Sequence, residues 1–219
     1  QYSFYLHSDD RTDIAAMATI STISQPLRGE FIRTAATAGA VVYQVDARLP
    51  ALIPVFFAGQ LSAVRLCAVM ALVSGTWSSL TGLPDEPENG EAALPVSPET
   101  EYQRRRYTLT LQNDRSGERV ESVLTEASSR LRGDLLRNLI ITGLALHTTA
   151  PELPRLLASM PVPPTSVSEL QALVQQMAGT ADVNRAAAAV PDTPAASAAP
   201  VSGSDTREIK KNMRRAFGD

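Results

Sequence analysis

The sequence predicts a mainly α-helical fold with a short β-ribbon, built from a duplicated unit plus additional helices and followed by a disordered C-terminal tail. Three observations predict this fold class. The chain repeats itself after a shift of 104 positions, each copy opens with a short alternating run of residues, and the composition changes sharply after Gly179. With 44% hydrophobic but only 5% aromatic residues among 219, the core must be mostly aliphatic.

The duplication is clearest in the middle of each copy. LRGEFIRTAATAGAVVYQVDARLPAL (27–52) aligns with LRGDLLRNLIITGLALHTTAPELPRL (131–156), and eight positions are identical. The identical residues are Leu27, Arg28, Gly29, Arg33, Gly39, Leu49, Pro50 and Leu52, matched by Leu131, Arg132, Gly133, Arg137, Gly143, Leu153, Pro154 and Leu156. With one residue of gap, 1–10 aligns with 106–115. We expect Gly39 and Gly143 to permit a close crossing of helices.

Each copy opens with a predicted strand, at 2–7 (YSFYLH) and at 107–112 (YTLTLQ). Apolar and polar residues alternate with a period of two, which is typical of a strand with one buried face. The apolar faces are Tyr2, Phe4 and Leu6 in the first copy and Tyr107, Leu109 and Leu111 in the second. We expect these six side chains to belong to the core.

Helices follow each strand. A polar turn, SDDRT or NDRSG, supplies Asp and Asn residues that suit a helix N-cap. The expected helices span about 13–23, 27–45, 118–128 and 131–149. Leu-Pro pairs at 49–50 and 153–154 mark a further turn and helix, and in the second copy another helix begins at Ser166 or Ser168 and runs to about Met177.

Changes in composition divide the chain into five segments. The expected segments are a first unit with extra helices at 1–81, an acidic Pro-rich linker at 82–104, a second unit with extra helices at 105–179, a disordered Ala/Pro-rich linker at 180–204, and an amphipathic helix at 205–219. The linker compositions bury too little apolar surface to fold by themselves.

Charge and cysteine content restrict the function classes. The net charge is −3, but residues 104–160 hold nine Arg against six Asp and Glu, so the second copy is locally basic. The single cysteine, Cys67, cannot form a disulfide within the chain, which fits a reducing cytoplasm. It lies in an apolar run, and we expect it to be a buried small side chain. We expect no membrane span, cofactor or metal site. No enzyme motif such as a P-loop, GxSxG or HExxH is present, so we expect a protein that is not an enzyme.

A strand followed by two helices, found twice, is similar to the ribbon-helix-helix fold. One such unit cannot bury its own strand, so two units pair their strands into an antiparallel ribbon, within one chain or between two. A β-ribbon is thin enough to enter the major groove of DNA. Because the two strands differ in sequence, a ribbon formed within one chain would suit an asymmetric DNA site.

The second copy also resembles the ParR/StbB plasmid-partition adaptors. The resemblance rests on Arg105-Arg106 before the strand, a basic loop before the second helix, the stretch RNLIITGLAL at 137–146, and the Pro-bearing turn and leucine-rich helix that follow. It covers about 105–178, and more weakly 1–75. The resemblance implies binding to iterated centromere-like sites on double-stranded DNA, with self-association there, and recruitment of an actin-like ParM-type filament protein by the C-terminal peptide. The family usually has a single unit and dimerises, whereas this chain holds two.

The outward faces of the strands are the candidates for reading DNA bases, since Ser, Thr, Gln and Arg all bond to base edges. The base-reading candidates are Ser3, Tyr5, His7, Arg106, Thr108, Thr110 and Gln112. The N-termini of the second helices are the candidates for phosphate, because free amides and the helix dipole favour anions. The phosphate candidates are Ser24, Gln25, Arg28, Ser129, Arg130 and Arg132. The alternatives are an exposed strand that binds nothing, and arginines that pair with Glu30 or Asp134.

The last residues form the candidate partner-binding helix. Ile209, Met213 and Phe217 recur at helical spacing and form one stripe, while Lys210 and Arg214 occupy other faces. A disordered tether raises the local concentration of such a motif, which favours binding to a partner over docking on its own domain. Two alternatives stay open for the whole protein: a relaxosome accessory protein of conjugation, and a ribbon-helix-helix transcriptional repressor or antitoxin.

Overall fold

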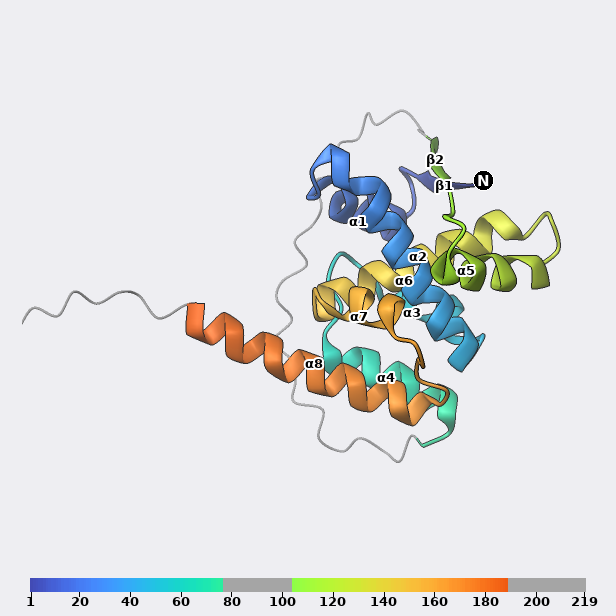
Figure 1. Ribbon diagram of the computed structural model, residues 1–219. Coiled ribbons are helices and arrows are strands. Elements are labelled where there is room, and N and C mark those ends of the chain that lie inside the picture. Colours follow the sequence, from blue (N-terminus) through green and yellow to red (C-terminus); the bar gives the residue numbers. More distant parts are fainter. Residues whose placement is uncertain (77–103, 189–219) are drawn as a thin grey trace, which may run out of the picture. The chain divides into compact units, whose positions relative to one another are not determined.

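The two copies fold with the same order of elements in a computed structural model of the chain (Figure 1). The structure describes residues 1–76 and 104–188, with side chains through 179. The first copy contains β1 (Tyr2–His7), α1 (Arg11–Ser21), a 3-10 turn (Gln25–Leu27), α2 (Arg28–Val45), α3 (Leu49–Phe56) and α4 (Ala63–Ser74). The second contains β2 (Arg104–Leu109), α5 (Arg115–Glu126), α6 (Arg132–Thr149), α7 (Leu153–Ser159) and α8 (Val167–Ala188). The predicted tail helix at 205–219, residues 82–103 of the first predicted linker and residues 189–204 of the second lie outside the described residues.

The predicted β-ribbon forms within one chain. Strands β1 and β2 pair antiparallel, with Tyr2 opposite Leu109 and His7 opposite Arg104. Phe4 lies opposite Tyr107, and their rings stack with centroids 5.2 Å apart. Phe4, Leu6 and Leu109 are buried, so one face of the ribbon belongs to the core, as the alternation predicts.

The second strand lies three residues earlier than predicted, at Arg104–Leu109 instead of 107–112. The register explains the shift. Tyr2 pairs with Leu109 and His7 with Arg104, so the six residues opposite β1 are Arg104–Leu109. Residues 110–113 instead lead into α5, so Thr110 and Gln112 lie outside the ribbon.

Aspartate caps fix where the first helices begin. The Asp10 carboxylate accepts from the Asp13 amide at 3.0 Å, and the Asp114 carboxylate accepts from the Gly117 amide at 2.7 Å. These bonds satisfy amides that have no partner within the helix, so α1 and α5 start at the residue after each aspartate. Both helices therefore begin and end two or three residues earlier than predicted, at Arg11–Ser21 and Arg115–Glu126.

The two copies share one hydrophobic core, in which α2 crosses α6. At the crossing, a Cβ added to Gly39 would lie 2.1 Å from the Leu139 carbonyl oxygen. A Cβ added to Gly143 would lie 2.2 Å from the Ala35 carbonyl oxygen. The prediction that these glycines permit close packing is confirmed. The contacts are also reciprocal, since 35 and 39 align with 139 and 143, so the copies are related by a local pseudo-two-fold.

A short helix of each copy packs on the long helix of the other copy. Helix α3 of the first copy packs on α6, and α7 of the second copy packs on α2. Helices α2 and α5 pack together, and so do α6 and β1. Residues 1–76 and 104–179 therefore contribute to one shared core.

The last described helix, α8, is longer than predicted. It continues to Ala188, whereas the sequence predicts its end near Met177 and a disordered linker from 180. The run ADVNRAAAA at 181–189 contains four consecutive alanines and no glycine, and the first proline after it is Pro191. Alanine has the highest helix propensity, which explains the continuation.

Candidate nucleic-acid interface

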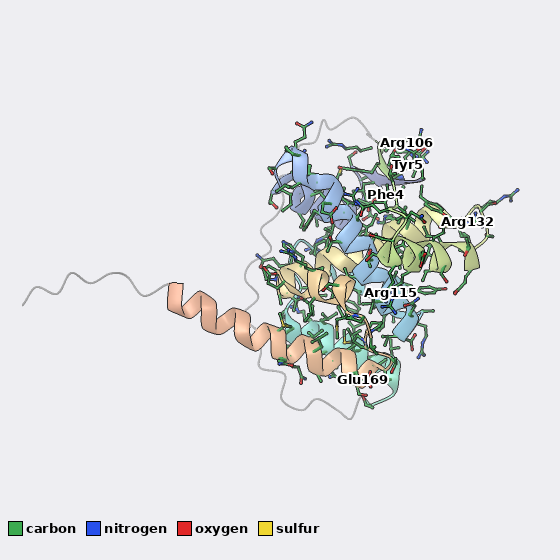
Figure 2. The ribbon with its side chains drawn as sticks, in the orientation of Figure 1. Phe4, Tyr5, Arg106, Arg115, Arg132 and Glu169 are labelled. Carbon is green, nitrogen blue, oxygen red and sulfur yellow. The ribbon has the colours of Figure 1, made fainter. Side chains whose placement is uncertain are left out.

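The outer face of the ribbon gathers polar and aromatic side chains from both strands. Residues opposite each other in an antiparallel pair point to the same face. Ser3 lies opposite Thr108, Tyr5 opposite Arg106, and His7 opposite Arg104. These six residues are defined here as the ribbon face, and Figure 2 labels two of them, Tyr5 and Arg106. On the other side of the ribbon Phe4, Leu6 and Leu109 are buried, whereas Arg105 is exposed.

Two arginines of the ribbon face are held by residues of the facing strand. The Arg106 guanidinium donates to Ser3 Oγ at 3.0 and 3.3 Å. The Arg104 guanidinium carbon lies 3.5 Å from the centroid of the Tyr5 ring, a cation–π contact. Both arginines are exposed. These contacts restrict the two guanidinium groups, which remain accessible to solvent.

The structure brings together most of the base-reading candidates but adds one and removes two. Arg104 belongs to the ribbon face, although the sequence places the strand too late to include it. Thr110 and Gln112 are exposed, but they lie in the loop before α5. The carbonyl of Gln112 instead lies against Gly117, where an added Cβ would approach it to 2.0 Å.

The N-termini of α2 and α6 flank the ribbon (Figure 1). Burial raises the pKa of Tyr107 in β2, and the positive charges of Arg105 and Arg28 lower it in part. Arg28, at the start of α2, therefore lies close enough to β2 to act on Tyr107. Burial raises the pKa of Tyr2 in β1 in the same way, helped by Glu121 and opposed by Arg132 at the start of α6.

The two arginines at these helix starts brace the preceding turns. Arg28 Nε donates to the Ile23 carbonyl at 2.8 Å, and Arg132 Nε donates to the Ala127 carbonyl at 3.2 Å. The alternative of pairing with Glu30 is wrong for Arg28, because Glu30 pairs with Arg33 of its own helix. Each guanidinium has five N–H donors, so these bonds leave donors available for a phosphate.

The remaining phosphate candidates lie in exposed turns before these helices. Ser24 and Gln25 are exposed in the first copy, and Ser129 and Arg130 are exposed in the second. Neither α2 nor α6 has a side-chain hydrogen bond at its N-cap. The first-turn amides of both helices are therefore not capped by a neighbouring serine, threonine or aspartate.

An ion-pair network links the two copies, and the sequence alone does not indicate it. Arg137 of α6 donates from Nε to Asp13 Oδ1 at 2.6 Å and from Nη2 to Asp10 Oδ2 at 3.2 Å. Asp13 is 1% exposed and also accepts from the His7 amide at 2.9 Å. Burial raises the pKa of Asp13, and the bonds from His7 and Arg137 oppose that rise. The network fixes the end of β1 to both α1 and α6.

The second copy has no equivalent of this network. Gly117 follows its N-cap by three residues, as Asp13 does in the first copy, but it carries no carboxylate. Arg33, the counterpart of Arg137, turns to Glu30 instead. A shallow groove remains between the copies there, lined by Glu30, Arg33, Thr34, Thr37, Leu111, Gln112, Asp114 and Gly117.

Other kinds of site find little support in the described part of the chain. Within residues 1–76 and 104–188, no three His, Cys, Asp or Glu side chains group together in a way that suits a metal ion. In the same ranges, no helix is long and apolar enough to cross a bilayer. Cys67 is buried, as predicted, and burial raises the pKa of its thiol.

The fold defines a class of protein in which one chain supplies both strands of a β-ribbon and both halves of the helical core around it. This chain belongs to the plasmid stability protein family, whose family model matches residues 1–70 and again 105–174. The matches begin 104 residues apart, which is the shift that aligns the two copies. A search of curated proteins and a search of solved structures each returned no match to the chain.

Proposed function

We propose that this chain is a plasmid-partition adaptor of the ParR/StbB type, which binds double-stranded DNA through a ribbon-helix-helix fold and recruits a filament protein through its tail. The observation that carries the proposal is the ribbon, with a buried apolar face and a polar face that holds Arg104 and Arg106. Membership of the plasmid stability family supports a role in plasmid maintenance. The proposal assigns the chain no catalytic activity.

The chemistry of the ribbon face suits base recognition. A two-stranded ribbon fits the major groove, where arginine bonds bidentately to guanine and the hydroxyls of Ser3 and Thr108 bond to several base edges. Arg106 is held by Ser3, which reduces the freedom that it loses on binding. The helix starts beside the ribbon supply the second kind of contact, in which Arg28, Arg132 and the uncapped amides bind phosphates.

One chain supplies a complete ribbon, so we expect one chain to occupy one DNA site. The two strands differ on the ribbon face, where Ser3, Tyr5 and His7 of β1 lie opposite Thr108, Arg106 and Arg104 of β2. A site without two-fold symmetry fits such a ribbon. Several chains on iterated sites would then place several tails close together, which raises their effective concentration toward a filament end.

The DNA-binding half of the proposal is tested by Arg106→Ala. Loss of a bidentate arginine–guanine pair is expected to weaken binding about ten- to hundredfold. The measurement is fluorescence anisotropy with a duplex that the intact chain selects from a random-sequence pool. Arg155→Ala is the matched control, because it removes the same charge from an exposed position on α7. Equal weakening by both variants, or no selection of DNA by the wild type, would contradict the proposal.

The recruiting half of the proposal rests on the sequence of the tail, which lies outside the described residues. Deletion of 205–219 is expected to leave DNA affinity unchanged and to abolish co-sedimentation with filaments of a ParM-type protein. Ile209→Asp combined with Phe217→Asp should reproduce that loss, because both substitutions fall on the apolar stripe. Asn212→Asp, off the stripe, should not. Undiminished filament binding by the deletion variant overturns this half.

Two other functions use the same DNA-binding fold. Duplication of the unit favours a relaxosome accessory protein, and a tail that wraps a toxin would fit an antitoxin or repressor. Affinity capture with the intact chain distinguishes them, since a relaxase, a toxin or an actin-like ATPase would be retained. Retention of a relaxase or toxin, with no actin-like ATPase, would replace the partition proposal.

A further inference from the structure

Two large apolar side chains are exposed at matching positions in the two copies. Leu27 is 61% exposed and Leu131 is 58% exposed, and they are the N-cap residues of α2 and α6. Their backbone angles agree to within a degree, with φ −92 and ψ −11 for Leu27 and φ −93 and ψ −10 for Leu131. Both open the triplet Leu-Arg-Gly. The pair is therefore one structural feature present twice.

The fold does not explain these leucines. Both leucines have helical backbone angles at the end of a turn, which most residues adopt, so the backbone does not require leucine there. Neither leucine belongs to the hydrophobic core or packs against its edge. Most of the 27–52 and 131–156 sequences differ between the copies, yet both keep the exposed leucine.

The position of the leucines relative to the ribbon indicates what covers them. Leu27 is followed by Arg28, which lies near Tyr107 of β2. Leu131 is followed by Arg132, which lies near Tyr2 of β1, and a Cβ on Gly133 would lie 3.5 Å from the Ser3 carbonyl oxygen. The leucines thus lie on the two flanks of the ribbon, each beside an arginine; Figure 2 shows Arg132 on one flank.

We infer that Leu27 and Leu131 pack against the deoxyribose rings of the DNA backbone on either side of the ribbon; this inference rests on the proposed DNA binding. A DNA strand presents charged phosphates alternating with apolar sugar carbons. Each helix start presents the complementary pair, an arginine beside an exposed leucine. A second copy of the protein is a poorer occupant, because Arg28, Arg130 and Arg132 would then face like charges.

The test replaces both exposed leucines with serine, a small polar residue. Leu27→Ser combined with Leu131→Ser is expected to leave the melting temperature nearly unchanged, because both side chains are exposed and lie outside the hydrophobic core. The same variant is expected to bind a random-sequence duplex pool about tenfold more weakly, since two partly buried leucine contacts are lost. The slope of log affinity against log salt concentration should not change, because an apolar contact releases no counterions.

Two controls make the result specific. Leu27→Met with Leu131→Met keeps the apolar contact and should retain wild-type affinity. Leu72→Ser removes a leucine that is 53% exposed on α4, away from the ribbon, and should also retain it. Wild-type affinity in the serine double variant, or a changed salt slope, overturns the inference while DNA binding by the wild type stands. Failure of the wild-type chain to bind DNA overturns the proposed function itself.

Discussion

Gly39→Ala is expected to destabilise the folded unit by about 3 kcal/mol, the upper end of the cost of overpacking. The added Cβ would lie 2.1 Å from the Leu139 carbonyl oxygen, which is backbone and cannot rotate away. The helices must separate instead, and the core between the copies loses contact. For a unit of this size, the melting temperature should fall by roughly 6–12 °C in differential scanning calorimetry. Gly143→Ala, which meets Ala35 in the same way, should have a similar effect.

Gly29→Ala is the matched control for this crossing. Gly29 lies in the first turn of α2, and a Cβ there would meet nothing within 4 Å. Alanine is the better helix former, so this variant should keep or slightly raise the melting temperature. Equal behaviour of Gly29→Ala and Gly39→Ala would show that the crossing is not close, and would contradict the shared core.

Arg137→Ala is expected to cost about 3 kcal/mol or more at neutral pH, because it leaves the buried Asp13 carboxylate without its cation. Chemical denaturation gives the free energy of unfolding directly. Arg33→Ala is the control supplied by the pseudo-symmetry. Arg33 pairs with the exposed Glu30, and pairs of this kind contribute less than about 1 kcal/mol.

The effect of Arg137→Ala should also depend on pH. Burial places the folded pKa of Asp13 above its unfolded value, so ionisation of Asp13 lowers stability as the pH rises through the folded pKa. Loss of Arg137 raises that pKa further. The stability deficit of the variant should therefore be full at neutral pH and shrink in acid, where Asp13 is protonated in both proteins. A deficit that does not vary with pH would mean that Asp13 is not the group left unpaired.

Much of the fold follows from patterns in the sequence. The shift of 104 positions reveals both copies, and the alternation in YSFYLH reveals the first strand and its buried face. Glycines at equivalent positions, Gly39 and Gly143, indicate the helix crossing. These features are predictable because each depends on residues close together in one copy, or on identity between the copies.

Features that depend on register or on contacts between the copies were not predictable. Alternation alone does not set which residues of 104–112 pair with β1, so it wrongly excludes Arg104 from the ribbon and wrongly includes Thr110 and Gln112. The bond between Asp13 and Arg137 joins residues 124 positions apart. The sequence shows only that both copies have arginine at this position, as Arg33 and Arg137. That identity does not reveal the bond to Asp13, because Arg33 pairs with Glu30 instead.

Site-specific photocrosslinking tests whether the ribbon face of one chain contacts DNA. A photoreactive phenylalanine analogue at position 5 or position 108 of the full chain would be irradiated with a labelled random-sequence duplex pool, and an analogue at position 72 on α4 serves as the control. We expect covalent DNA adducts from positions 5 and 108, each containing a single chain, and none from position 72. Absence of adducts from both ribbon positions, or equal adducts from position 72, would contradict DNA contact through the ribbon face.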